Sequence, residues 1–384
     1  MNVFEKYFKG DKVIWIVVTL LSIISILTVY SSIVTLAYKY KQGDTFYYLF
    51  KHLIIILVGF VLIISAHNVQ YKYYSRISQI ALYLSIPLLL LTLITGANIN
   101  DASRWLVIPV INQSFQTSDL AKLALIMYLA RMLSKHQDHI KDFKQAFVPI
   151  MAPVLIVCAL ILPANFSTAA MLFTTSIIIM FIGRINVKYI LSLIGIAVVA
   201  FAMMLLIAKS YPKLLPRFDT WVQRIESFSG KDSETNYQAE QAKIAIATGG
   251  IIGKGPGKST QRNFLPHPYS DFIYAIILEE YGLLGGLIVL FLYLVLFYRG
   301  VKIANKAERT FGTLLAAGLS FSLVFQAMIN MAVAVNLFPV TGQPLPLVSM
   351  GGTSIWFTCL AIGIILSVSN NERKKDNLNQ LKNA

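Results

Sequence analysis

Charged residues are scarce in this sequence. Only 13% of its 384 residues are Asp, Glu, Lys or Arg, whereas 56% are hydrophobic. Water-soluble domains contain about 25% charged residues, so the composition excludes an ordinary soluble enzyme or binding domain. Long apolar runs dominate the chain instead. The sequence therefore predicts an all-α integral membrane protein.

Cysteine is nearly absent as well. Cys158 and Cys359 are the only two, and both lie inside apolar runs. A small buried side chain is the more common role there than a disulfide. His267 has no second His or Cys among the fifty or so residues around it, which argues against a zinc site. No metal ligands are expected from this sequence.

Acidic residues are the scarcer of the two charge types, with 18 Asp and Glu against 33 Lys and Arg. A net charge of +15 can indicate a nucleic-acid partner, but the basic residues are spread between apolar runs and form no single patch. We therefore expect no nucleic-acid partner. Lys6, Lys9 and Lys12 precede the first apolar run without a small-residue cleavage site, so this run is expected to stay as an anchor.

The apolar runs are long enough to cross about 30 Å of hydrocarbon at about 20 residues each. They predict about ten transmembrane helices, with both termini on one side. The short loops on the opposite side hold few basic residues, Lys39, Lys41, Lys51 and Arg104. Because short loops rich in Lys and Arg stay in the cytoplasm, both termini are expected to be cytoplasmic. The expected spans are 13–37, 50–66, 79–97, 118–133, 147–163, 166–183, 187–208, 270–298, 311–336 and 351–370.

One connection is much longer than the others. It runs from about 209 to 269, between spans 7 and 8 on the extracytoplasmic side, and its length makes it a functional candidate. Pro212 and Pro216 mark its start, and Tyr237 to Ala247 predicts a short helix on the membrane surface. No soluble domain or internal repeat is evident. Residues 1–384 are therefore expected to form a single polytopic membrane domain, with a cytoplasmic tail from about 371 to 384.

The long loop ends in a glycine-rich, basic stretch that runs into an apolar helix. Its cations Lys254, Lys258 and Arg262 lie among glycines, so they can approach a phosphate closely. Asp271 is expected in the first turn of the helix, where the chain enters the bilayer. By position alone, a plain helix N-terminal carboxylate is an equally good interpretation of this residue. The combination predicts a membrane enzyme that acts on a phosphorylated lipid.

Lys122 lies in an apolar run, where a charge is costly. Because Asp119 lies three positions earlier, a local ion pair explains Lys122 as well as any function does. In the alternative, Lys122 faces an inner cavity, where it pairs with Glu279 or Glu280 or meets a substrate phosphate. Trp105 near the outer interface is typical of an ordinary membrane-belt residue.

Six motifs occur in order along nearly the whole chain. They are SRWL (103–106), FQTSDLAKLAL (115–125), GGIIGKGPGKSTQ (249–261), LPHPYSDFIYAIILEEYGLLGG (265–286), FQAMIN (325–330) and PVTGQPLPLVSMGGTS (339–354). This series resembles the SEDS family of shape, elongation, division and sporulation proteins, which includes FtsW and RodA. The resemblance implies an inverting peptidoglycan glycosyltransferase of ten spans. Such an enzyme polymerises lipid II on the outer face of the bacterial cytoplasmic membrane, paired with a class B penicillin-binding transpeptidase.

The resemblance also implies roles for individual residues. Asp271 matches the essential catalytic carboxylate of the family, and Trp105 and Lys122 match its functional Trp and Lys. No cofactor is required by any motif, although a divalent cation, Mg²⁺ or Mn²⁺, is compatible with a pyrophosphate leaving group. Asn165 or its neighbour stands where the family usually has an acidic residue, and Met350 where an aromatic residue is common. The residues expected to bind substrate are Trp105, Lys122, Lys254, Lys258, Gln261, Arg262, His267 and Ser349.

Within the family the resemblance favours the FtsW-like division members, which act at the septum with other divisome proteins. A RodA-like polymerase of side-wall elongation is the first alternative. A transporter that flips a lipid-linked precursor is the second, and it would need repeated halves and a broken helix at midplane. A noncatalytic scaffold that only activates the transpeptidase is the third.

Overall fold

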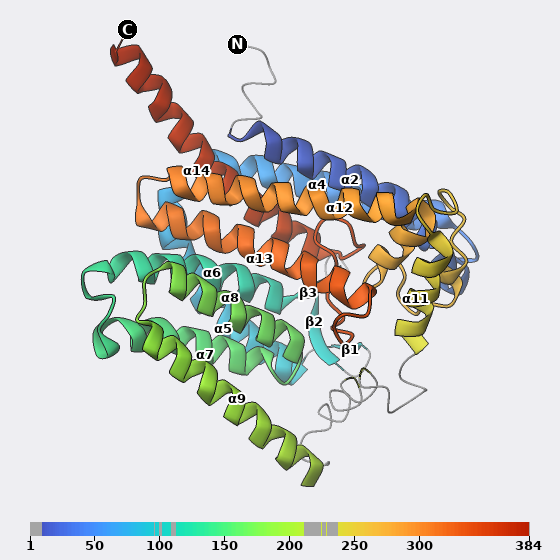
Figure 1. Ribbon diagram of the computed structural model, residues 1–384, viewed down its shortest axis with the longest axis horizontal. Helices are drawn as coiled ribbons and strands as arrows, with labels where there is room; N and C mark the ends of the chain where they lie inside the picture. The colour runs from blue at the N-terminus through green and yellow to red at the C-terminus, as the bar shows by residue number, and fades with distance from the viewer. Residues whose placement is uncertain are drawn as a thin grey trace.

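The computed structural model describes residues 10–95, 97–99, 102–108, 113–210, 224, 228 and 237–383. These residues form a bundle of long helices that lie side by side (Figure 1). Four residues used to predict the topology and the long loop lie outside the described residues. They are Lys6, Lys9, Pro212 and Pro216.

Each predicted apolar run coincides with a helix, except that the run at 13–37 is divided into two helices at Ile33. Within the described part of the chain, seven helices are long and apolar enough to cross a membrane, and residues 166–182 and 187–203 form shorter apolar helices. The prediction of an all-α bundle of about ten spans is confirmed. The helices are α2 (Lys12–Ser32), α4 (Thr45–Asn68), α5 (Tyr71–Thr95), α6 (Thr117–Lys135), α7 (Val148–Ile161), α8 (Phe166–Ile182), α9 (Val187–Ser210), α12 (Ile273–Lys306), α13 (Thr310–Ala334) and α14 (Thr353–Asn383). Two shorter α-helices are α3 (Val34–Lys41) and α11 (Tyr237–Gly249).

Apolar side chains cover both the inside and the outside of the bundle. On α2, Val18 and Leu21 are buried against neighbouring helices, whereas Leu20 and Leu27 are exposed. A helix that is apolar on all sides is typical of a membrane span, because lipid rather than water covers its outer face. Helix α13 contacts α12, α6, α14 and α8, which places it near the centre of the bundle.

The first and last helices meet at one end of the bundle. A Cβ atom on Gly10 would lie 3.0 Å from the carbonyl oxygen of Leu366 in α14. Asp11 caps α2 and accepts a hydrogen bond of 2.8 Å from Nε of Arg299, near the end of α12. The start of α2 and the end of α14 therefore lie on the same side of the bundle (Figure 1), as an even number of spans requires. The expected tail continues α14 as a helix to Asn383.

The opposite end carries a small antiparallel sheet of strands β1 (Ala97–Ile99), β2 (Ala102–Ile108) and β3 (Gln113–Gln116), in that order. The spans expected at 79–97 and 118–133 left these residues as a connection, and no strand was predicted there. In β2 Trp105 lies opposite Gln116, the last residue of β3. Helix α6, which carries Asp119 and Lys122, begins directly after β3. The sheet is therefore joined to the start of this span. These strands are too short for their alternating pattern to stand out between two apolar runs.

Candidate active site

Helix α12 is broken near its start. Gly282 has φ 67° and ψ −169°, so a short helix from Ile273 ends there and a longer one begins at Leu283. The expected uninterrupted span at 270–298 was wrong in this detail. A break frees backbone groups that a continuous helix would pair internally. In a membrane these groups need partners from elsewhere in the protein.

The glycine-rich loop supplies those partners. It crosses the break, and its backbone bonds to both halves of α12. The four hydrogen bonds run from Lys254 N to Glu279 O (3.0 Å), from Gly255 N to Glu280 O (2.9 Å), from Leu283 N to Gly250 O (2.9 Å) and from Leu284 N to Ile251 O (3.2 Å). Loop and broken helix are therefore one structural unit.

Two glycines make this crossing possible. Gly253 has φ 90°, and a Cβ atom there would lie 2.3 Å from the carbonyl oxygen of Glu280. A Cβ atom on Gly282 would lie 2.3 Å from the carbonyl oxygen of Ile251. No side chain fits at either position. The sequence suggested that the loop glycines allow approach to a phosphate, and the structure gives one of them, Gly253, a packing role against α12.

Glu279 anchors the loop to α12 through its side chain. The carboxylate is fully buried, and its Oε1 lies 2.6 Å from Nζ of Lys254. It also accepts hydrogen bonds from the backbone N–H groups of Thr260 (3.1 Å) and Gln261 (3.2 Å) and from the hydroxyls of Ser259 and Thr260. The partly exposed Lys254 ammonium is therefore bound to the Glu279 carboxylate. Lys258, by contrast, is exposed.

Arg262 also points into the protein. Its Nη1 donates to the carbonyl oxygen of Ser31 (3.0 Å) and to the Ser31 hydroxyl (3.1 Å), at the end of α2. That hydroxyl in turn donates to Glu280, which also accepts from the backbone N–H of Ser259 at 3.2 Å. Arg262, Ser31 and Glu280 thus tie the loop to α2 and α12 together.

Asp271 lies in the turn before α12, two residues ahead of the first helical residue. Its half-buried carboxylate accepts a hydrogen bond of 3.0 Å from the Ser270 hydroxyl. Gly342 borders the other oxygen, because a Cβ atom there would lie 3.7 Å from Oδ2. Asp271 was expected in the first turn of the helix, and this was wrong by two residues. The residue still lies at the junction between loop and span.

The backbone around Asp271 is held by the loop at 339–350. The buried Ser349 hydroxyl donates to the carbonyl oxygen of Ser270 at 2.6 Å, and Met350 N–H donates to that of Tyr269 at 2.9 Å. Ser349 therefore supports the backbone next to Asp271, and its expected role in substrate binding stays a prediction. The His267 ring packs edge-on against Tyr269, with Nδ1 3.5 Å from the tyrosine hydroxyl.

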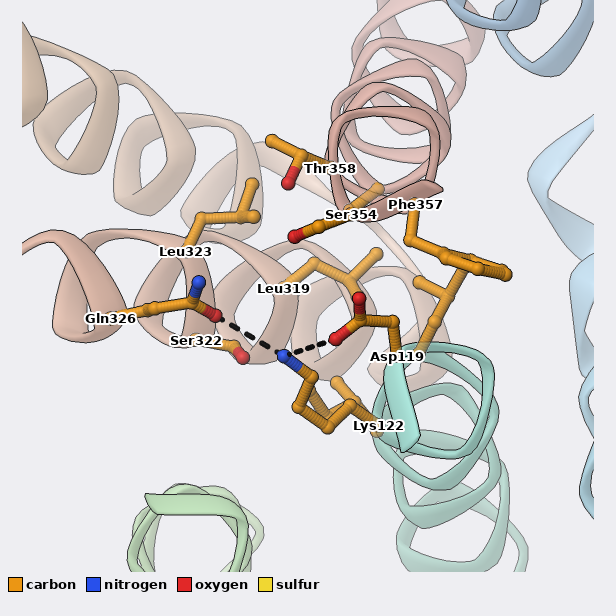
Figure 2. A pocket seen from close by; sticks show the side chains of 12 residues that line it. Asp119, Lys122, Leu319, Ser322, Leu323, Gln326, Ser354, Phe357 and Thr358 are labelled. Carbon is orange, nitrogen blue, oxygen red and sulfur yellow. Dashed lines mark hydrogen bonds and ion pairs between the residues drawn. The ribbon is translucent and has the colours of Figure 1, made fainter. Parts of the chain in front are cut away.

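Lys122 lies at a cavity between α6, α13 and α14 (Figure 2). Its Nζ is 2.8 Å from Oδ1 of Asp119 and 3.3 Å from Oε1 of Gln326. The local ion pair is therefore confirmed, and so is the inner cavity, whereas Glu279 pairs with Lys254 instead. The cavity has an empty volume of about 400 Å³, which includes its open mouth. Its other walls come from Leu123, Ile126, Leu319, Ser322, Leu323, Ser354, Phe357, Thr358 and Ala361.

Two amides on α13 connect this cavity to Asp271. Gln326 accepts from Lys122 and donates to the carbonyl oxygen of Pro344 at 3.0 Å. One turn later, Asn330 donates to the carbonyl oxygens of Asp271 (2.9 Å) and Gln343 (2.7 Å). No role was expected from the sequence for either residue. Their signal was available, since two amides four residues apart share one face of an otherwise apolar span.

Trp105 is half-buried, and Gln116 opposite it receives support from α14. The backbone N–H of Gln116 donates to the Thr353 hydroxyl at 3.3 Å. Asn165 caps α8, where its Oδ1 accepts from Thr168 N–H at 3.3 Å. An Asp would cap this helix equally well, so the departure at Asn165 preserves the local structure. In the described part of the chain no three His, Cys, Asp or Glu residues group as metal ligands.

Comparison with known proteins identifies the family. A family model described as a cell cycle protein, that of FtsW, RodA and SpoVE, matches residues 11–374. The chain belongs to this family. One relative is a protein of Trichlorobacter lovleyi named probable peptidoglycan glycosyltransferase FtsW. It is 33% identical, and the match covers 94% of this chain and 93% of the relative. Stage V sporulation protein E of Bacillus subtilis is 32% identical and covers 94% of this chain and 98% of its own.

Solved structures share the fold. A chain of a peptidoglycan synthase complex superposes with a TM-score of 0.73 at 23% identity, covering 94% of this chain and 98% of its own. The rod shape determining protein RodA of Thermus thermophilus superposes with a TM-score of 0.69 at 21% identity, covering 96% and 99%. The chain is therefore a multi-pass membrane protein whose architecture is shared with these solved structures.

Proposed function

We propose that this protein is a peptidoglycan glycosyltransferase that polymerises lipid II, with Asp271 as the catalytic base. The observation that carries the proposal is the placement of Asp271. Its carboxylate borders Gly342 at the end of the bundle, while Asn330 and Ser349 hold the backbone around it from below. A single rigidly supported carboxylate where loop meets span suits an amphiphilic substrate. The names of the relatives support the same activity.

The reaction needs one proton acceptor. Asp271 takes the proton from a sugar hydroxyl of the acceptor, and the hydroxyl oxygen forms a bond to the anomeric carbon of the donor. The bond from that carbon to the lipid pyrophosphate breaks, and the pyrophosphate leaves with the electron pair. A single displacement of this kind inverts the anomeric centre. Base catalysis typically contributes about 10²–10⁴ in rate.

The leaving pyrophosphate needs positive charge. Lys254 and Arg262 are turned toward Glu279 and Ser31, so they act through the loop that they hold. The exposed Lys258 and the cavity residue Lys122 are better placed to meet a phosphate. Trp105 and His267 are half-buried, Gln261 is buried in the loop beside Glu279, and the three complete the proposed substrate region. Mg²⁺ or Mn²⁺ could bind the pyrophosphate itself, with no protein ligand set required.

The proposed activity requires the Asp271 end of the protein to lie on the outer side of the membrane. With both termini in the cytoplasm, the Asp271 end faces outward, where lipid II is consumed. A class B penicillin-binding transpeptidase is the expected partner, and the relatives named FtsW favour action at the division septum with other divisome proteins. A RodA-like role in side-wall elongation is the alternative within the family.

The broken helix α12 is the one observation that favours a transporter, because transporters bind ions or substrates at such breaks. Here the protein's own loop occupies the break, since the four backbone groups described above already have partners. The two functions separate in one preparation. Proteoliposomes that hold the protein and its inactivated transpeptidase receive fluorescent lipid II in the outer leaflet. We expect glycan chains without movement of lipid II between leaflets. Movement without polymer would contradict the proposal.

A further inference from the structure

Two adjacent isoleucines protrude from the glycine-rich loop. Ile251 is 67% exposed and Ile252 is 80% exposed. Both lie in the turn with which this loop begins, directly after α11. Leu283 and Leu284 of α12 are about half exposed, and their N–H groups bond to the backbone of this turn. We refer to Ile251 and Ile252 as the isoleucine turn. In water, four neighbouring apolar side chains of this size would be an unusual surface.

The depth of the isoleucine turn follows from its bonds to α12. At the far end of that helix, Arg299 pairs with Asp11, and Lys302 and Lys306 follow. These charges mark that edge of the hydrocarbon. From Arg299 back to Leu284 the helix rises about 22 Å at 1.5 Å per residue. The hydrocarbon core is about 30 Å thick, so Leu284 lies inside it by several ångströms.

The backbone of the turn is suited to that depth. Irregular backbone inside a bilayer is tolerated only where its polar groups find partners in the protein. Here the carbonyl oxygens of Gly249, Gly250 and Ile251 accept hydrogen bonds from Gly253, Leu283 and Leu284. The isoleucine turn thus presents apolar side chains outward while these carbonyl groups are paired.

Helix α11 leads into the turn across the end of the bundle rather than along it (Figure 1). Its small residues Ala242 and Ala245 are buried, and α11 packs against α12. On its other face Ile244 is 42% exposed beside the exposed Lys243. The exposed face of α11 therefore carries both an apolar and a basic side chain.

We propose that the isoleucine turn inserts into the acyl chains of the leaflet on the Asp271 side. The lipid surface is then the partner of this loop, and insertion fixes how deep the Glu279 anchor and the following segment to Asp271 lie. The inference stands apart from the proposed function, because depth can be measured without any activity.

Site-directed spin labelling tests the depth. Cys158 and Cys359, both buried, are replaced by Ala, and single cysteines are placed by Ile252→Cys and, as a second site, Ile251→Cys. Leu287→Cys on the exposed face of α12 is the hydrocarbon reference, and Asp138→Cys in the exposed loop after α6 is the aqueous reference. The labelled proteins are reconstituted in phosphatidylcholine and phosphatidylglycerol vesicles. Gel filtration and thermal unfolding show that each variant is folded.

The readout is relaxation of the label by oxygen, which concentrates in lipid, and by a water-soluble nickel chelate. We expect a label at 251 or 252 to match the one at 287, with high oxygen and low nickel accessibility. A label that matches position 138 would overturn the proposal, because the turn would lie in water. Protection from both reagents would also overturn it, because protein rather than lipid would cover the turn.

Discussion

Asn330 and Asp271 are joined by a hydrogen bond of 2.9 Å from the Asn330 amide to the Asp271 carbonyl oxygen. The same amide nitrogen donates to the carbonyl oxygen of Gln343 at 2.7 Å. One side chain near the end of α13 therefore connects the catalytic candidate to the loop beside it. Asn330 is a positioning residue in this account, since it acts through the backbone.

Replacing Asn330 by Asp keeps the shape of the side chain and removes both N–H donors. The buried carbonyl oxygen of Gln343 and the partly buried one of Asp271 then lose their partner, and a buried polar group left unpaired costs about 1–3 kcal/mol. We expect at least a tenfold fall in lipid II polymerisation with substrate binding retained. Asn68→Asp is the matched control, because Asn68 also donates to a carbonyl oxygen but is exposed at the far end of α4. Full activity of Asn330→Asp would contradict the positioning role.

The ion pair between Lys254 and Glu279 stabilises the loop. In Lys254→Met the buried carboxylate loses its ammonium partner but keeps its hydroxyl and backbone donors. We expect the free energy of unfolding in detergent to fall by about 1–3 kcal/mol. Lys258→Met, on the exposed lysine of the same loop, should change it by less than about 0.5 kcal/mol. Equal effects of the two changes would show that the pair contributes nothing.

Gly282→Ala tests the close crossing of loop and helix. The φ and ψ angles of Gly282 are accessible to glycine almost alone, and its Cβ atom would lie 2.3 Å from a carbonyl oxygen. Gly250→Ala is the control, because Gly250 has φ 57° but open space around the new methyl group. We expect a loss of about 1–2 kcal/mol for Gly250→Ala and a larger loss for Gly282→Ala in thermal unfolding. A larger loss of stability for Gly250→Ala than for Gly282→Ala would contradict the close crossing of loop and helix.

The role of Lys122 can be resolved with a double-mutant cycle. Lys122→Met leaves the buried Asp119 carboxylate without its cation and should lower stability. Adding Asp119→Asn removes that charge, so we expect most of the lost stability to return. Polymerisation should stay low in the double variant if Lys122 meets the substrate phosphate. Recovery of activity together with stability would leave Lys122 with a structural role only.

The positions of the spans followed from the sequence, because a run of about 20 apolar residues has few stable forms other than a membrane helix. Asp271 and the cations of the loop could also be singled out, since charges at a membrane boundary are few. The break at Gly282 could not be predicted, because one glycine in an apolar run is compatible with a continuous helix. It depends on a loop that lies about thirty residues earlier in the chain.

The same reason explains why Lys254 and Arg262 were assigned to a phosphate. Their partners Glu279 and Ser31 lie far away in the sequence, and only folding brings them together. Ser349 likewise reads as a polar residue of an outer loop until its bond to the Ser270 carbonyl is seen. The Lys122 and Asp119 pair was predictable because both residues lie on one turn of a helix.

The central claim is that Asp271 is the base of a glycosyl transfer. The most direct test compares wild type with Asp271→Asn in polymerisation of labelled lipid II, each bound to the inactivated transpeptidase. Asp138→Asn, an exposed carboxylate after α6, is the matched control. We expect Asp271→Asn to bind lipid II as wild type does and to lose at least about 10² in polymerisation rate, with Asp138→Asn unchanged. Polymer formed by Asp271→Asn at the wild-type rate would contradict the account.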